Sequence, residues 1–135
     1  MRYPFLLIIV LMSFDSFSQK TEKEDFTEFL TQFSVNPNFQ IERVKFPLPF
    51  KTWKDFQNGI DTTIFLTKDS WRMESFWESK TKFYTQIFNN FKKELEDTDE
   101  RVFSYLGIEN GIEVNFYFKR IDGKWFLIKK EDLSS

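Results

Sequence analysis

The side chains that most often carry catalysis are missing from this sequence. Its 135 residues include no His and no Cys, which removes the commonest general base, the thiolate nucleophile and cysteine-based zinc sites. Acid–base chemistry would need two carboxylates buried together, such as Asp55 with Asp61 or Glu74, so that the pKa of one is raised. Nothing in the spacing of these residues requires such a pair. The sequence therefore predicts a protein that is not an enzyme and holds no cofactor.

Charged residues give no clear binding site either. The acidic stretch "ELEDTDE", residues 94–100, has the oxygen ligands that calcium prefers. It lacks the glycine and the later bidentate glutamate of an EF-hand loop, so a solvated turn is the simpler interpretation. The formal net charge is −2, and the basic residues form no continuous track. We therefore expect neither a metal site nor a nucleic-acid-binding surface.

Aromatic side chains offer a different chemistry, the binding of an apolar or planar molecule. The sequence contains 19 Phe and has an aromatic fraction of 20%. The chain ends on "FKRIDGKWFLIKKEDL", residues 118–133, which is typical of an aromatic hairpin around Asp122-Gly123. Asn110-Gly111 is a second dipeptide of the kind that forms two-residue hairpin turns. Together they predict a meander of three antiparallel strands.

The two turns predict which side chains of the meander face each other. The predicted pairs are Phe118 with Leu127 and Arg120 with Trp125 across the second turn, and Tyr105 with Phe116 and Phe103 with Phe118 across the first. Because side chains alternate along a strand, both turns place the same apolar set on one face. That set is Phe103, Tyr105, Val114, Phe116, Phe118, Trp125 and Leu127.

An amphipathic helix near the N-terminus is expected to cover this face. Its apolar residues, spaced i, i+3, i+4 and i+7, are Phe26, Phe29, Leu30 and Phe33. Thr21 and Glu24 have the spacing of a capping box, and Asn36-Pro37 ends the helix. A helix on one side of a bent antiparallel sheet is an α+β domain.

The middle of the chain predicts further elements. Residues 39–48 are expected to form a strand that ends at Pro47 and Pro49, followed by a loop or short helix over residues 49–60. Residues 62–67 are β-branched and apolar, as in a strand. Residues 83–95 have both helical and alternating apolar spacing. We favour a strand over residues 83–88, because residues typical of strands surround it and Asn89-Asn90 bounds it.

The first 18 residues have the three regions of a secretory signal peptide. Arg2 is basic, residues 5–12 are apolar, and the small residues Ser16 and Ser18 precede the expected cleavage point. The apolar run is too short to cross a bilayer, which takes about 20 residues. We therefore expect residues 1–18 to be removed, leaving a periplasmic or secreted protein with one domain over residues 19–135 and no membrane span. The alternative is a buried N-terminal strand or helix.

Two segments resemble known families. The ending "VNFYFKRIDGKWFLIKKEDL", residues 114–133, looks like the final hairpin of the nuclear transport factor 2-like (NTF2-like) superfamily. Residues 25–48, "DFTEFLTQFSVNPNFQIERVKFPL", resemble the start of an uncharacterised family of exported Bacteroidetes proteins, domain of unknown function 4348. The residues that carry this second resemblance are Phe39-Gln40 and Arg43, Lys45, Phe46, Pro47 and Leu48.

The resemblance implies a helix-lined, strongly bent sheet whose concave face encloses a cavity. It implies no activity, because the narrower family has none assigned. Enzymes of the broader superfamily often use an Asp with a His or Tyr in that cavity. This chain has no His, so it lacks one of the usual partners for such catalysis.

The aromatic face therefore predicts a site for a small apolar or amphipathic ligand, since ligand pockets are mostly apolar with a few orienting polar groups. The predicted ligand-binding residues are Tyr105, Phe116, Phe118, Trp125, Trp77 and Arg43. Arg43 can hold a carboxylate or phosphate. The alternatives are that the rings fill an ordinary core and that Arg43 points to solvent from an edge strand.

The opposite face of the meander is more apolar than a solvated surface needs. Its predicted residues are Leu106, Tyr117, Ile121, Phe126 and Ile128 among Glu113, Asn115, Lys119 and Lys130. Open apolar faces are unusual in monomers, so we expect covering elements or a homodimer through this outer face. The favoured function is non-enzymatic binding of a small ligand or a protein partner. The alternative is a structural or interaction module with a filled core, acting through the outer face.

Overall fold

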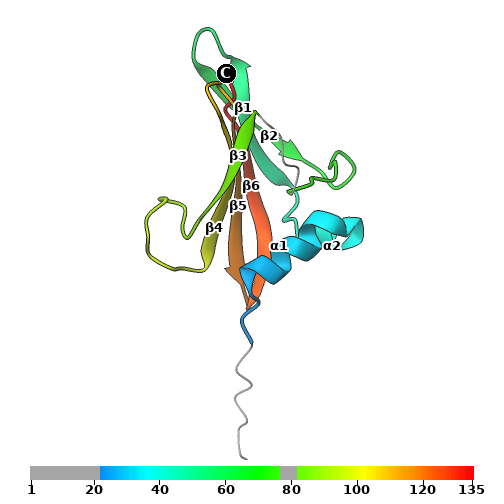
Figure 1. The fold of residues 1–135 in the computed structure, drawn as a ribbon. Coiled ribbons are helices and arrows are strands. Elements are labelled where there is room, and N and C mark those ends of the chain that lie inside the picture. The colour runs from blue at the N-terminus through cyan, green and yellow to red at the C-terminus, as the bar shows by residue number, and fades with distance from the viewer. Residues whose placement is uncertain (1–21, 77–81) are drawn as a thin grey trace, which may run out of the picture.

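The computed structural model describes residues 22–76 and 82–135, which form two short helices and one six-stranded sheet (Figure 1). The helices are α1 (Phe26–Val35) and α2 (Pro37–Glu42). The strands are β1 (Leu48–Asp55), β2 (Ile60–Leu66), β3 (Phe83–Phe88), β4 (Glu100–Gly107), β5 (Glu113–Ile121) and β6 (Lys124–Asp132). Both helices lie on one side of the sheet, so the predicted α+β fold is confirmed.

The strands lie in the order β2-β1-β6-β5-β4-β3, and every neighbouring pair is antiparallel except β1 with β6. The predicted signal peptide, residues 1–18, lies outside the described residues. In the part of the chain that the structure describes, no helix is long and apolar enough to span a bilayer.

Helix α1 forms where the apolar spacing predicts it. The Asp25 side chain caps its start by accepting a hydrogen bond from the Glu28 backbone N–H at 3.0 Å. The predicted capping residue Thr21 lies outside the described residues. The helix ends at Val35, as Asn36-Pro37 indicates. Its buried face lies against the sheet, so its role as the cover of the aromatic face is confirmed.

The predicted strand over residues 39–48 is wrong. Most of its first half belongs to α2, because Pro37 is suited to the first turn of a helix and the Asn36 side chain caps that helix, accepting from the Phe39 N–H at 3.1 Å. The alternation of apolar and polar residues along this short segment favours a strand less strongly than the proline and the capping side chain at its start favour a helix. Strand pairing begins only with an isolated parallel bridge between Val44 and Leu127.

The predicted loop or short helix over residues 49–60 is also wrong, because β1 occupies most of it. β1 lies parallel to β6, with Phe50 opposite Lys130, and antiparallel to β2, with Phe50 opposite Ile64. The four residues after Asp55 form the hairpin loop, and Gly59 adopts φ +67° there. The predicted strands over residues 62–67 and 83–88 are confirmed as β2 and β3.

The β5–β6 hairpin has the predicted register. Phe118 lies opposite Leu127 and Arg120 opposite Trp125, and both turn residues, Asp122 and Gly123, have positive φ. The β4–β5 register differs from the prediction by two residues, since the connection is longer than the Asn110-Gly111 pair. The observed partners are Tyr105 with Val114, Phe103 with Phe116 and Arg101 with Phe118. A shift of two keeps every side chain on its predicted face.

We call the face on which α1 packs the inner face and the opposite one the outer face. The core lies between α1 and the strands β4, β5 and β6, and it consists mainly of rings in edge-to-face contact. Phe118 lies 5.7 Å from Phe29 and 5.5 Å from Phe33, between ring centroids, and Trp125 lies 5.0 Å from Phe26. This geometry is the favoured one for aromatic pairs.

Candidate functional site

Three of the predicted ligand-binding residues lie in the packed core. Phe116 is 1% exposed, and Phe118 and Trp125 are 0% exposed. The ring of Phe76, from the segment that precedes β3, lies 4.8 Å from Phe116 and 6.1 Å from Phe118. Protein rings therefore occupy the space next to these residues, as the alternative of an ordinary core predicts.

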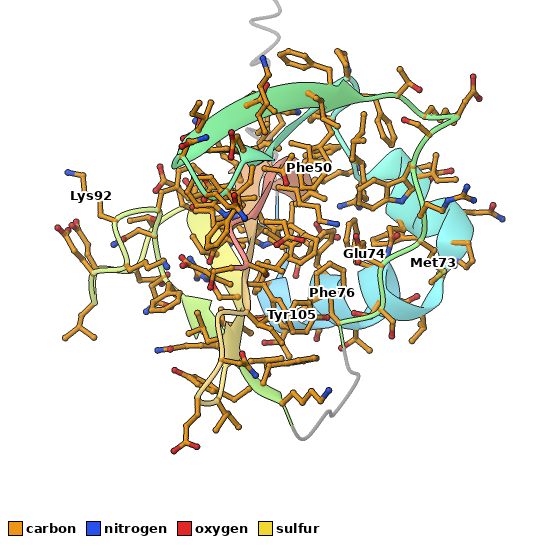
Figure 2. The ribbon with its side chains drawn as sticks, turned by 90° about the horizontal axis from the view of Figure 1, so that it is seen from above. Phe50, Met73, Glu74, Phe76, Lys92 and Tyr105 are labelled. Atoms are coloured by element: carbon orange, nitrogen blue, oxygen red, sulfur yellow. The ribbon has the colours of Figure 1, made fainter. Side chains whose placement is uncertain are left out.

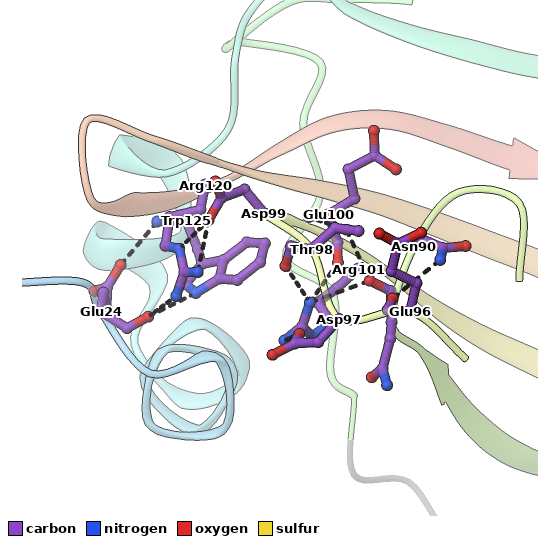
Figure 3. Close-up of polar contacts among 11 residues, drawn as sticks. Glu24, Asn90, Glu96, Asp97, Thr98, Asp99, Glu100, Arg101, Arg120 and Trp125 are labelled. Carbon is purple, nitrogen blue, oxygen red and sulfur yellow. Dashed lines mark hydrogen bonds and ion pairs between the residues drawn. The ribbon is translucent and has the colours of Figure 1, made fainter. Parts of the chain in front are cut away.

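The polar groups of Trp125 and Arg43 are used within the protein. The Trp125 indole N–H donates to the Glu24 carbonyl at 2.8 Å, and its backbone N–H donates to the Glu24 carboxylate at 2.8 Å (Figure 3). Arg43 donates to the same carboxylate at 2.8 Å and to the Trp125 carbonyl at 3.1 Å. Its guanidinium also lies 4.7 Å from the centroid of the Phe39 ring. Arg43 thus joins the N-terminal segment to β6.

The remaining predicted residues lie elsewhere. Tyr105 is at the border of the core, where its hydroxyl donates to the Ser75 carbonyl at 2.7 Å. Trp77 lies outside the described residues. The sequence therefore grouped core residues correctly. Among the described members of the set, Tyr105 lies at the edge of the core, beside a partly exposed surface of the sheet.

That surface begins at a β-bulge. Phe118 pairs with Leu127, but the preceding residue Tyr117 pairs with Lys129, so Ile128 is the extra residue of β6. Beyond the bulge the alternation of β6 is reversed. Lys130, predicted on the outer face, therefore lies on the inner face opposite Phe116. The prediction was wrong because no local sequence signal marks the extra residue.

Lys130 lies in a site made of rings and one carboxylate. Its ammonium is 5.2 Å from the ring centroids of both Phe50 and Phe116 and donates to the Glu74 carboxylate. The two charged side chains are 17% and 26% exposed. Figure 2 shows Phe50, Glu74, Phe76 and Tyr105 gathered between the sheet and the helices. A cation between two ring faces is stabilised by their quadrupoles.

Glu74 is held in place by a fully bonded amide. Gln40 is 0% exposed, and its side-chain N–H groups donate to the carbonyls of Phe33 at 2.6 Å and Glu74 at 2.8 Å. Its oxygen accepts from the Trp71 indole at 3.0 Å and from the Glu74 N–H at 2.9 Å. All four hydrogen-bonding positions of the amide are used. Gln40, which the sequence singled out only through a family resemblance, thus fixes the backbone that presents Glu74 to Lys130.

Most of the inner-face residues next to the ion pair are polar. Two residues beyond Lys130 on β6, the strand registers place one row across the sheet, made of Thr62, Thr52, Asp132, Val114, Tyr105 and Thr85. We call Phe50, Glu74, Tyr105, Lys130 and Asp132 the upper inner face. This surface combines aromatic rings with a cation and two carboxylates, a composition that suits an amphipathic guest.

The outer face of the same strands holds a buried polar row. Glu131, Asn115 and Ser104 lie side by side on β6, β5 and β4, and all three are buried. Burial raises the pKa of Glu131, but hydrogen bonds from the Tyr117 hydroxyl and the Lys129 ammonium lower it by more, so the net direction is downward. Burial and the same Glu131 contact raise the pKa of Tyr117.

The carboxylates considered for catalysis are not paired with each other. Asp55 is the last residue of β1, next to the β1–β2 loop, and hydrogen bonds from Asn58 lower its pKa, opposite to the change that a general acid needs. Glu74 faces Lys130 rather than a second carboxylate. Over residues 22–76 and 82–135, no cluster of three or more acidic side chains is arranged for a metal ion.

The acidic stretch of residues 94–100 lies against arginines instead (Figure 3). Arg120 donates to the Asp99 carboxylate at 2.6 Å and 2.8 Å, and this contact lowers the pKa of Asp99. Arg101 donates to Asp97 at 2.6 Å and to the Thr98 carbonyl at 2.6 Å. Asp97 and Asp99 of this stretch are therefore paired with arginines, and Glu100 is the first residue of β4.

Comparison with known proteins agrees with this architecture. A solved NTF2-like protein from Bacteroides fragilis NCTC 9343 is similar over 87% of this chain, with 25% identity and a TM-score of 0.63. A protein-family model also matches residues 24–132 of this chain. This chain belongs to an uncharacterised NTF2-like family of Bacteroidetes. The resemblance seen in the sequence is thereby confirmed.

A second solved structure has the same fold. A protein from Bacteroides uniformis ATCC 8492 is similar over 81% of this chain and 76% of its own length, with 23% identity and a TM-score of 0.57. The matched region of this chain covers 50% of the length of the Bacteroides fragilis protein. No curated protein matches the sequence. The NTF2-like family thus fixes the fold and names no activity.

Proposed function

We propose that this NTF2-like domain is an exported, non-enzymatic binding protein that holds a small amphipathic molecule at its upper inner face. The observation that carries the proposal is the partly exposed Lys130–Glu74 pair between the rings of Phe50 and Phe116. A partly buried charge that serves only the core is a weak source of stability, because desolvation offsets the Coulomb attraction. Its position among rings is better suited to orienting a guest.

The chemistry of the site indicates a guest with an acidic head and an apolar body. The Lys130 ammonium has three N–H donors, of which Glu74 accepts one. An acid group of the guest can accept another, while the apolar body lies on the partly exposed ring of Phe50. Tyr105 and Asp132 belong to the same surface, and they would limit which polar groups of the guest fit beside Lys130. The absence of His and Cys from the chain supports binding without catalysis.

Exchanging each partner of the ion pair tests the proposal. The probe is anilinonaphthalene sulfonate, an amphipathic anion whose fluorescence rises in apolar surroundings. Lys130→Met removes the cation and should weaken its binding about tenfold, since hydrogen bonds to charged groups are worth about 1.5–3 kcal/mol. Glu74→Gln removes the competing carboxylate and should tighten binding. Opposite signs from two residues that touch each other cannot come from a general loss of stability.

Lys119→Met is the matched control, because Lys119 is exposed on the outer face of the neighbouring strand. It should leave the fluorescence titration unchanged. Failure of the wild type to bind the probe, or an equal loss in both lysine variants, would contradict the proposal. Native mass spectrometry of protein purified from its own periplasm then identifies the natural guest and tests export.

A second candidate function is protein interaction through a module with a filled core. It is favoured by the complete burial of Phe118, Trp125 and Leu127, which leaves the part of the inner face under α1 without room for a guest. In this case the sheet surfaces carry the function. A homodimer through the outer face stays a prediction, and sedimentation at high micromolar concentration tests it.

A further inference from the structure

Strand β2 is an edge strand with apolar side chains on both of its faces. Its hydrogen-bonded neighbour is β1, and no strand of the described chain pairs with its other side (Figure 1). Ile64 on the inner face is 46% exposed and Phe65 on the outer face is 61% exposed, with Ile60 at 48%. Between Thr62 and Thr67 the strand carries no charge. Monomeric proteins commonly protect such edges with Lys, Pro or a bulge.

The β2 sequence is complementary to itself when two copies run antiparallel about Ile64. In that register Ile64 faces its own copy, Phe65 faces Thr63 of the second copy, and Leu66 faces Thr62. Aromatic residues opposite β-branched ones, and paired aliphatic residues, are favourable cross-strand contacts. No charged side chains face each other. Both sheets keep their inner and outer faces continuous across the junction, because the paired residues share the same alternation.

Neighbouring registers are less favourable. Centring the pair on Thr63 places the Asp61 carboxylate opposite Phe65, which would desolvate a charge without a partner. Centring it on Thr62 leaves Phe65 opposite Gly59, which has no side chain to contact. The register about Ile64 is therefore the best supported of the three.

We propose that the free edge of β2 binds a second copy of this chain, antiparallel about Ile64, to join two six-stranded sheets into one. The inference does not depend on the ligand site. An interface of one strand pair is small, so the dimer is expected to be weak and to form at concentrations on the order of 100 µM.

Sedimentation equilibrium of the purified protein, with matched variants of the two edge strands, tests the proposal. Phe65→Lys puts a charge at the junction and removes both Phe65–Thr63 contacts, so the dimer should weaken about tenfold or more. Tyr84→Lys is the control, because Tyr84 is 50% exposed on the outer face of β3, the other edge strand. This control should dimerise like the wild type. Both positions are half-exposed or more, so both variants should keep the wild-type circular dichroism spectrum.

A second measurement uses the absence of cysteine from the chain. A nitroxide attached to Ile64→Cys should show dipolar broadening from its copy, whereas one on Ile87→Cys of β3 should not. A wild type that stays monomeric at this concentration overturns the proposal. So does a dimer that Tyr84→Lys weakens more than Phe65→Lys, or one that neither variant affects, because the contact then lies on β3 or on a sheet face.

Discussion

The inner face of the sheet has two parts that differ in how they are covered. Below the β-bulge at Tyr117 and Phe118, α1 covers the strands, and Phe118, Trp125 and Leu127 are fully buried. Above it, Phe50 and Lys130 are only partly covered, by the segment that carries Glu74. Helix α1 has ten residues, about 15 Å of length, and cannot cover the whole sheet. The lower part therefore supplies stability, and the upper part is where we propose that a guest binds.

The largest test of this comparison replaces one aromatic residue in each part. Trp125→Ala leaves a cavity in the ring cluster and should lower the free energy of unfolding by about 3–5 kcal/mol in urea denaturation. Phe50→Ala in the upper part should cost about 1–2 kcal/mol, because Phe50 is only partly buried. Equal losses would mean that both parts contribute equally to stability.

A second test concerns the link between the two parts. Gln40→Leu keeps the approximate volume of the side chain but leaves the Glu74 backbone and the Trp71 indole without their partner. Buried groups left unpaired cost about 1–3 kcal/mol each, and we expect a loss of about 3 kcal/mol by urea denaturation. Gln86→Leu, at an exposed position of β3, should change stability by less than about 0.5 kcal/mol. Similar values for both would show that Gln40 does not support this segment.

The smallest expected effect is a pH dependence on the outer face of the upper strands. The pKa of Glu131 is below its ordinary value of 4.5 in the folded protein, so its contribution to stability is present above that pH and is lost as the pH falls through the folded-state pKa. Glu131→Gln should cost about 1–2 kcal/mol at neutral pH and give a shallower loss of stability in acid. Glu42→Gln, at an exposed position of α2, is the control and should retain the wild-type acid profile.

Elements defined by nearby residues were predictable. The spacing of Phe26, Phe29 and Phe33 defined α1, and Asp122-Gly123 defined the β5–β6 register. The β4–β5 register was missed by two residues, yet the face was correct because side chains alternate with period two. Local periodicity and turn chemistry act over a few residues, so the sequence displays them directly.

The candidate site was not predictable in the same way. Glu74 was considered only as half of a carboxylate pair, and Lys130 was expected on the outer face. Their contact joins residues 56 positions apart, and it depends on Gln40, which is 34 positions from Glu74. Short-range patterns carry no information about such pairs. The core residues Phe116 and Trp125 were proposed as binding residues because an aromatic core and an aromatic pocket have the same alternation.

The sequence alone determined the opening helix, the aromatic side of the last three strands and the lack of His and Cys chemistry, since each follows from composition or from neighbours along the chain. The tertiary structure alone decided that β1 joins β6 in parallel, that the bulge turns Lys130 inward, and that β2 is left as a free edge. These features depend on contacts between distant segments, whose free energy is set by packing and desolvation in the folded protein rather than by local preference.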